Sequence, residues 1–206
     1  MSEPSRTVEV ERKYDVDDST PLPSWDAIPG VDAVTAGEVR ALDARYFDTA
    51  TADLARSGVA LRRRTGGPDE GWHVKGPRTK DGRLELGWPL GESEEPPAAV
   101  AALIAQWATD PLLPLARIEN ARTAYLLTGP AGVVAEFVDD HVRGTDLRAA
   151  GGSPREWREW EMELGPAAPA DDAGREAFFA AVGRAVAEVG GRESRSGSKL
   201  GRALGL

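Results

Sequence analysis

The 206-residue chain contains no cysteine. This excludes disulfides, thiolate metal sites and cysteine nucleophiles. Only two histidines occur, His73 and His141, so a histidine-rich metal site or a Ser-His-Asp triad has few candidates. Any metal site must therefore use mainly oxygen ligands, which favours hard ions such as Mg²⁺ or Mn²⁺. The absence of cysteine is also compatible with a reducing compartment, and we expect a cytoplasmic location.

Long apolar runs and a net positive charge are missing as well. No run of about 18 apolar residues exists, so no segment is expected to span a bilayer, and MSEPSRTVEV lacks the layout of a signal peptide. The formal net charge of −9 makes general affinity for nucleic acid or anionic membrane unexpected. The length fits one domain over residues 1–206, with residues 1–6 as a flexible leader. The oligomeric state stays open.

Charged and apolar residues alternate along many short segments. In TVEVERKY (7–14), a strand would place Glu9, Glu11 and Lys13 on one face and the valines on the other. Comparable patterns predict strands at 39–47, 59–65, 72–76, 83–90, 115–129, 133–142 and 156–165. Helices with apolar stripes are predicted from Pro96 or Pro97 to before Pro111 and over 171–191, and a short helix or turn at 49–58.

The charged strand faces form one large set. For a single strand, a charged face turned to water is the ordinary explanation. Across the set, however, nearly every position is Arg, Lys, Glu or Asp, and the helices need the apolar faces as partners. The set comprises Glu9, Glu11, Glu85, Glu136, Asp140, Glu159, Glu161, Glu163, Lys13, Arg62, Arg64, Lys75, Arg83, Arg117 and Arg122, with Lys199 as an addition from the tail. We therefore predict an α+β fold, a sheet curled into a barrel with a charged, hydrated interior and helices outside.

The composition of this interior indicates its ligand. Arginine and lysine attract a polyanion, and their hydrogen-bond donors match phosphate oxygens. Carboxylates clustered beside that anion would take up protons unless a cation lay between them. A phosphate chain with a divalent metal ion is thus the predicted ligand set. An all-charged interior would offer little surface on which a base or another organic ring could stack.

The same residues resemble the CYTH superfamily, the triphosphate tunnel metalloenzymes. Glu9-x-Glu11-x-Lys13 is similar to the signature of that family near the N-terminus. Further similar motifs follow in the family's order over essentially the whole chain: RYFDT (45–49), ALRRRTG (60–66), WHVKGP (72–77), RLELGWPL (83–90), AEFVDD (135–140), EWEMEL (159–164) and SKLGRAL (198–204). The resemblance implies an eight-stranded antiparallel β-barrel whose tunnel holds a triphosphate, with helices packed outside.

The resemblance also implies roles for individual residues. Metal ligands would come from Glu9, Glu11, Glu136, Asp140, Glu159, Glu161 and Glu163, with two of the last three used and Glu161 and Glu163 favoured. Phosphate would be bound by Lys13, Arg62, Arg64, Lys75, Arg83, Arg117, Arg122 and Lys199. Glu9, Glu11, Lys75 and Asp140 would be catalytic, the last one assisting a second metal ion or the attacking water. Where the family commonly has another basic residue between positions 117 and 122, this chain has Glu119, Asn120 and Ala121, which leaves the length of the substrate open.

Three functions remain in competition. The leading expectation is a triphosphatase that hydrolyses a triphosphate, inorganic triphosphate above all, with Mg²⁺ or Mn²⁺ as cofactor. The first alternative is a class IV type adenylyl cyclase, which would convert ATP to cyclic AMP and diphosphate. The second is a non-catalytic module that binds polyphosphate. In each case the partner is a small molecule with a phosphate chain.

Overall fold

The computed structural model describes residues 3–148 and 153–206. Residues 1–2 of the predicted leader and residues 149–152 of the polar gap before the last predicted strand lie outside the described residues. Ser5 and Arg6, which we expected in the leader, are part of a strand and pair with Gly87 and Leu86. None of the helices in the described part of the chain has the length and apolar character needed to cross a membrane.

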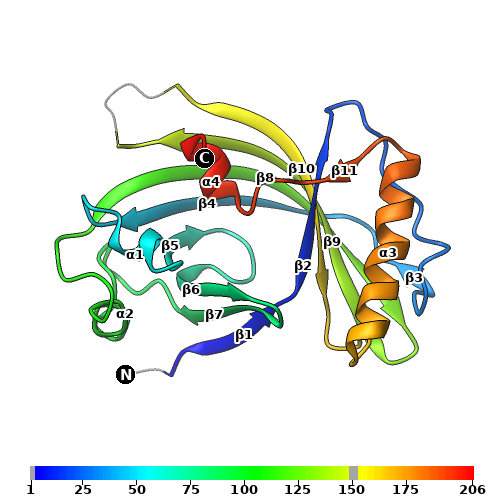
Figure 1. Cartoon of the computed structure of the whole chain (residues 1–206), viewed down its shortest axis with the longest axis horizontal. Helices are drawn as coiled ribbons and strands as arrows, with labels where there is room; N and C mark the ends of the chain where they lie inside the picture. Colours follow the sequence, from blue (N-terminus) through cyan, green and yellow to red (C-terminus); the bar gives the residue numbers. More distant parts are fainter. Residues whose placement is uncertain (1–2, 149–152) are drawn as a thin grey trace.

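One antiparallel sheet makes up most of the structure and curls around a central space (Figure 1). Its strands are β1 Ser5–Glu9, β2 Glu11–Val16, β3 Ala33–Val34, β4 Glu38–Asp48, β5 Ala60–Thr65, β6 Gly71–Thr79, β7 Gly82–Trp88, β8 Leu113–Gly129, β9 Gly132–Asp146, β10 Arg155–Leu164 and β11 Arg192–Glu193. The helices are α1 Asp53–Arg56, α2 Ala98–Ile104, α3 Asp172–Glu188 and α4 Lys199–Leu204. All strands predicted from alternation are present.

The first predicted strand is divided into β1 and β2, and these two pieces pair with strands at opposite ends of the curled sheet. The order of the strands is β1-β7-β6-β5-β4-β8-β9-β10-β2-β11, with β3 beside β8. Only Val10 separates β1 from β2, yet β1 pairs with β7 while β2 pairs with β10. This half-barrel confirms the predicted fold class. Its 11 strands exceed the expected eight because the first strand is split at Val10 and the two-residue strands β3 and β11 are added.

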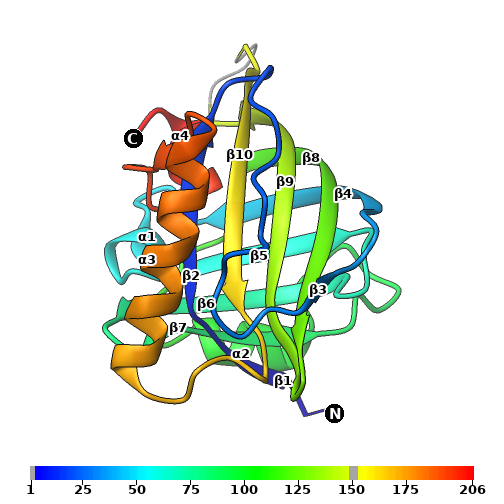
Figure 2. The ribbon, with the colours of Figure 1, turned by 90° about the vertical axis from the view of Figure 1, so that its right-hand side faces the viewer.

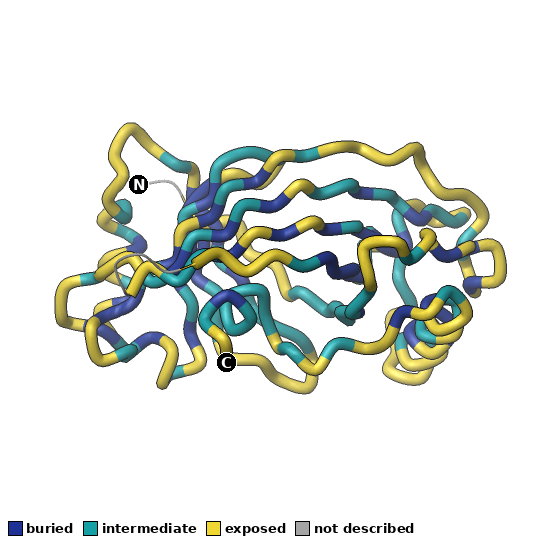
Figure 3. Tube along the Cα trace, turned by 90° about the horizontal axis from the view of Figure 1, so that it is seen from above, coloured by how far each residue is buried: buried dark blue, intermediate teal, exposed yellow. Residues whose placement is uncertain are grey.

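Period-two alternation places the apolar strand faces outward, where α2 and α3 cover them. Phe178 and Val182 of α3 pack with Trp160, Met162 and Phe137 of β10 and β9. Figure 2 shows α3 running alongside β2 and β10. A second cluster joins Val100 and Ile104 of α2 to Leu61, Trp72 and Val74 on β5 and β6. Buried and exposed residues alternate along the strands (Figure 3).

The short C-terminal helix α4 behaves differently from the other helices. Leu200 and Ala203 contact Ala44, Tyr46 and Ile118, which lie on the inner face of β4 and β8. This helix therefore packs against the concave side of the sheet (Figure 1), rather than outside it as expected for all helices. The sequence of α4 explains this position. Its apolar residues Leu200 and Ala203 lie next to Lys199, whose side chain reaches the interior carboxylates described below.

Packing of α3 predicts the consequence of removing its central side chain. Phe178 is only 1% exposed, so Phe178→Ala should lower the free energy of unfolding by about 3–5 kcal/mol, through lost burial and a residual cavity. Urea denaturation followed by circular dichroism measures the loss. The matched control Val39→Thr changes a side chain that is 78% exposed and should cost under about 0.5 kcal/mol. Equally small losses in both variants would contradict the packing of α3.

Candidate active site

The pairing register brings the predicted charged faces together on the concave side of the sheet. Glu161 lies opposite Lys13, and Glu163 lies between Glu11 on β2 and Glu136 on β9. A cavity of about 510 Å³ lies against this face. Its lining includes the predicted residues Glu9, Glu11, Lys13, Arg62, Arg64, Lys75, Arg83, Arg122, Glu136, Glu161, Glu163 and Lys199. Side chains from distant parts of the chain thus share one cavity that is open to solvent.

Three predicted site residues do not line this cavity. Asp140 and Glu159 are 0% and 3% exposed and lie in the wall behind it. Arg117 is on the outer face of β8, where its Nη2 lies 2.7 Å from Asp43 Oδ2. Since Arg117 and Arg122 are separated by five positions, the period of two places them on opposite faces. Arg117 therefore does not point into the cavity in which we predicted that it would bind phosphate.

Several residues that line the cavity were not predicted from the sequence. Arg40 pairs in register with Arg122, and Asn120 precedes Arg122 by two positions on the same face. The alternation rule would have found both, but the apolar Leu42 and Ala44 hid the pattern of β4, and Asn120 carries no charge. Tyr46, Asp69 and Arg78 also line the cavity.

Glu85 is the centre of a buried ion-pair group on β5, β6 and β7. Its carboxylate lies 3.0 Å from Arg62 Nη2, 2.9 Å from Lys75 Nζ and 2.6 Å from His73 Nδ1. Burial alone would raise the pKa of Glu85, but hydrogen bonds from His73 and Glu9 and the charges of Lys75 and Arg62 hold it below its ordinary value. Glu85 therefore fixes two of the basic groups that line the cavity, and His73 belongs to the interior.

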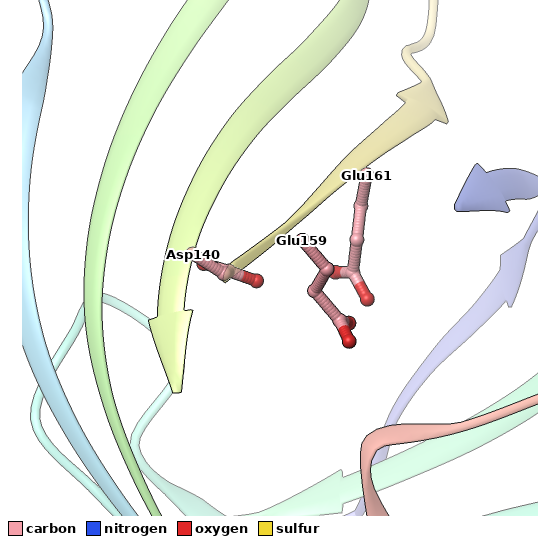
Figure 4. Close-up of side chains that lie close together, drawn as sticks. All are labelled: Asp140, Glu159 and Glu161. Carbon is pink, nitrogen blue, oxygen red and sulfur yellow. The ribbon is translucent and has the colours of Figure 1, made fainter. Parts of the chain in front are cut away.

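A second ion-pair group surrounds the ammonium of Lys199. Asp140, Glu159 and Glu161 offer oxygens that lie within 4.8 Å of one another (Figure 4), an arrangement that resembles a metal site. The Lys199 Nζ atom, however, lies 2.8 Å, 2.6 Å and 2.7 Å from these three carboxylates. Lys13 also contacts Glu161. The protein's own cations thus neutralise this acidic cluster.

Arg122 completes this second group. Its guanidinium donates to both carboxylate oxygens of Asp140, at 2.8 Å and 2.7 Å, and to Glu161 at 2.9 Å. Burial would raise the pKa of Glu161, but Lys13, Lys199 and Arg122 hold it well below its ordinary value. Asp140 therefore orients Arg122 and Lys199 and does not face the cavity itself.

Other carboxylates face the open cavity with less compensation. Glu163 forms no ion pair or hydrogen bond within the described ranges, and burial with the neighbouring Glu11 raises its pKa to about 7. Burial and a hydrogen bond with Glu85 raise the pKa of Glu9 to about 7 as well, despite Lys75 at 2.7 Å. Crowded carboxylates of this kind are what a bound cation would neutralise. A set of oxygen donors alone fits a hard divalent ion such as Mg²⁺ or Mn²⁺.

Arg62 and Arg64 on β5, both buried, and the partly buried Arg122 on β8 face the same space. Arg62 and Arg64 are each 7% exposed, and the Nε atom of each has no hydrogen-bond partner in the part of the chain that the structure describes. Burial and the charges of Arg62 and Arg122 lower the pKa of Arg64 to about 9. Guanidinium groups this close together repel one another unless an anion lies between them, and they match phosphate oxygens in geometry.

The cavity is not charged throughout, contrary to our expectation of an all-charged interior. One end is lined by apolar side chains: Leu42, Ala44, Val59, Leu115, Ile118, Leu200 and Leu204. The first five belong to β4, β8 and the segment before β5, whereas the last two belong to α4. Inward-facing positions of β4 thus change from Arg40 to Leu42 and Ala44. Our expectation that the interior offers little surface to an organic group is therefore wrong.

The CYTH domain family model matches residues 7–184. This chain belongs to the CYTH family. It is 38% identical over 213 aligned residues to uncharacterized proteins from two strains of Mycobacterium tuberculosis. The alignment covers 98% of this chain and 41% of each relative. The chain therefore spans less than half the length of these relatives.

Solved structures share the fold of this CYTH domain. A putative adenylate cyclase from Bacillus halodurans superposes with a TM-score of 0.64 at 18% identity, over 96% of this chain and 97% of the other. A putative adenylyl cyclase from Hippeastrum, described with a dominant triphosphatase activity, gives a TM-score of 0.55 at 17% identity, over 96% and 95%. Identities this low establish the fold alone.

Neutralisation of the acidic cluster by Lys199 predicts a pH-dependent loss of stability in Lys199→Met. Removal of one partner from a buried ion-pair group costs about 3–5 kcal/mol, and we expect this loss near pH 8. In the wild type, the lowered pKa of Glu161 contributes stability above its ordinary value of 4.5. In the variant the folded-state pKa values rise, so protonation near pH 5 relieves the repulsion and the loss shrinks.

Urea denaturation at pH 8 and at pH 5, in buffer of low ionic strength, measures the free energy of unfolding at both pH values. The control Lys80→Met removes a lysine whose side chain is 89% exposed and should have no effect at either pH. An equal loss at both pH values in Lys199→Met would show that Lys199 acts through packing and not through its charge.

Proposed function

We propose that this CYTH domain is a divalent-metal-dependent triphosphatase that releases phosphate from a triphosphate. The observation that carries the proposal is the arrangement of one cavity. The guanidinium groups of Arg62, Arg64 and Arg122 share this cavity with the carboxylates of Glu9 and Glu163, whose pKa values are raised to about 7. Guanidinium groups and hard-cation ligands together are the set that a phosphate chain with its metal ion requires.

We assign phosphate binding to the basic residues that line the cavity. Arg62, Arg64 and Arg122 would donate to non-bridging oxygens, with Lys75 and Arg83 on the neighbouring strands. Glu85 and Asp140 hold Arg62 and Arg122 in place through ion pairs at 3.0 Å and 2.7 Å. Since phosphoryl transfer depends mainly on positioning and charge stabilisation, pre-arranged guanidinium groups are effective catalysts of it.

We assign metal binding to carboxylates that face the open cavity. Glu9, Glu11 and Glu163 would hold Mg²⁺ or Mn²⁺, with Glu136 next to Glu163 in register. The ion would take over the charge compensation that Lys75 gives to Glu9 and that Lys13 and Arg78 give to Glu11. A cation there would supply Lewis-acid stabilisation of the negative charge on the phosphate oxygens. Asp140 and Glu159 do not line the cavity, and Glu161 is engaged by Lys13, Arg122 and Lys199 together. We therefore assign these three carboxylates to positioning the basic groups.

Hydrolysis needs no covalent enzyme intermediate at such a site. Water attacks the terminal phosphorus in line with the bond to the bridging oxygen, and that bond breaks. The shortened phosphate chain leaves, and a cavity carboxylate accepts the proton of the water. The Hippeastrum protein, which shares this fold, is itself described with triphosphatase activity, and this supports the same proposal here.

A second candidate function is supported by the apolar end of the cavity. Leu42, Ile118 and Leu200 offer a surface for an organic group attached to the phosphate chain. An adenylyl cyclase would use that surface for adenine and would form cyclic AMP and diphosphate from ATP. A module that only binds polyphosphate would release neither product. Product analysis with triphosphate and with ATP separates these functions and also identifies the substrate.

The proposed metal ligands predict the outcome of a charge-neutral substitution. Glu163→Gln should lower kcat/KM for triphosphate hydrolysis about 100-fold or more, because a cation ligand and a proton acceptor are both lost. Chelation of the metal with EDTA should abolish phosphate release by the wild type. A phosphate-release assay with Mg²⁺ or Mn²⁺ measures both effects.

The matched control is Glu156→Gln on the same strand. Glu156 belongs to β10 but points to the outer face, where its side chain is 75% exposed, so this variant should retain wild-type activity. Retention of full activity by Glu163→Gln, or activity that survives EDTA, would remove the proposed metal site.

A further inference from the structure

The loop between β5 and β6, residues 66–70, reaches over the cavity. Gly66 and Gly67 adopt φ values of 78° and 79°, a left-handed conformation that favours glycine. A Cβ atom on Gly66 would lie 2.1 Å from the carbonyl oxygen of Ala41, so the loop passes close against β4. Pro68 and Asp69 then line the cavity. The course of the loop therefore brings a carboxylate to the phosphate-binding face.

Asp69 is attached to that face through two of its groups. Its carboxylate forms an ion pair with the guanidinium of Arg64. Its backbone carbonyl lies 3.3 Å from Arg64 Nη2 and 2.9 Å from His73 Nε2. The side chain of Asp69 is 58% exposed, whereas that of Arg64 is only 8% exposed. The carboxylate thus lies at the solvent side of a buried guanidinium.

Arg62, Arg64 and Arg122 differ in the kind of partner that each of them has. Arg62 pairs with Glu85, and Arg122 pairs with Asp140 and Glu161, all of them buried residues of the sheet. Arg64 has a carboxylate partner from an exposed loop and, among residues 3–148 and 153–206, from nowhere else. Its partner is therefore the one whose carboxylate can regain water on leaving, provided that another anion compensates the buried guanidinium.

We propose that Asp69 is an intramolecular competitor for the substrate, whose carboxylate occupies Arg64 until a phosphate group displaces it. This inference rests on the proposed function, because it assigns Arg64 to phosphate binding. When the phosphate arrives, the carboxylate rotates into solvent and the guanidinium exchanges one anion for another. The carbonyl of Asp69 accepts a hydrogen bond from Arg64 Nη2 and lies 2.9 Å from His73 Nε2, which holds the loop backbone in place, so the exchange is a side-chain rotation. Asp69 thereby sets the affinity of the cavity for the phosphate chain.

The test is the substitution Asp69→Asn, which removes the charge and keeps the shape and the backbone carbonyl. Isothermal titration calorimetry with inorganic tripolyphosphate, in buffer without divalent metal, measures the affinity directly. We expect a Kd about two- to sixfold lower than in the wild type, which is the range by which an exposed ion pair reduces the competent fraction. KM in the phosphate-release assay should fall by the same factor, with kcat unchanged.

Two controls separate competition from a general charge effect. Glu70→Gln removes the same charge from the same loop, but Glu70 accepts a hydrogen bond from the amide of Gly66, and the glutamine keeps an acceptor for it. This variant should bind tripolyphosphate like the wild type. In an Arg64→Gln background, the further change Asp69→Asn should have no effect, because the guanidinium for which Asp69 competes is gone.

Each outcome bears on a different claim. An unchanged or higher Kd in Asp69→Asn, or the same gain in Glu70→Gln, overturns the competition while the proposed function stands. Binding by Asp69→Asn alone, with none by the wild type, supports the competition. If neither protein binds tripolyphosphate, the competition and the proposed function are both overturned.

Discussion

Compensation of buried charge on the concave face of the sheet is the interaction on which the rest of the structure depends. Carboxylates from β2, β9 and β10 are desolvated there, and each would be costly without a partner. Lys199 contacts Asp140, Glu159 and Glu161 together, and this places the C-terminal helix inside the curled sheet. The same ion pairs tie the last residues of the chain to strands that are distant in sequence.

Buried charges are fully compensated in some parts of the concave face and incompletely compensated in others. Around Lys199 and Glu85 the charges are matched at hydrogen-bond distance, so these groups stabilise the wall and orient its bases. Towards the open cavity, Glu163 and Arg64 have no buried partner of opposite charge among the residues that the structure describes. Unmatched carboxylates and guanidinium groups in one space are complementary to a cation and an anion that arrive together. The apolar end by α4 adds room for an organic group.

Alternation of residues in the sequence was sufficient to predict the longer strands, their inward faces and most of the charged residues that line the cavity. Its failures have physical causes. Arg117 was grouped with Arg122 by residue type, although an odd spacing sends it outside. Asn120 and Arg40 obey the same rule but lie beside apolar residues. The contact of Lys199 with Asp140, the division of carboxylates into wall and cavity groups, and the position of Asp69 over Arg64 all depend on tertiary packing. No local pattern encodes them.

The most direct measurement is a crystal structure of the protein soaked with inorganic triphosphate and Mn²⁺, with anomalous data collected for manganese. The account predicts an anomalous peak among the carboxylates of Glu9, Glu11 and Glu163, and phosphate density against the guanidinium groups of Arg62, Arg64 and Arg122. Manganese bound elsewhere, or triphosphate located on the outer face of the sheet with the cavity free of phosphate, would contradict it.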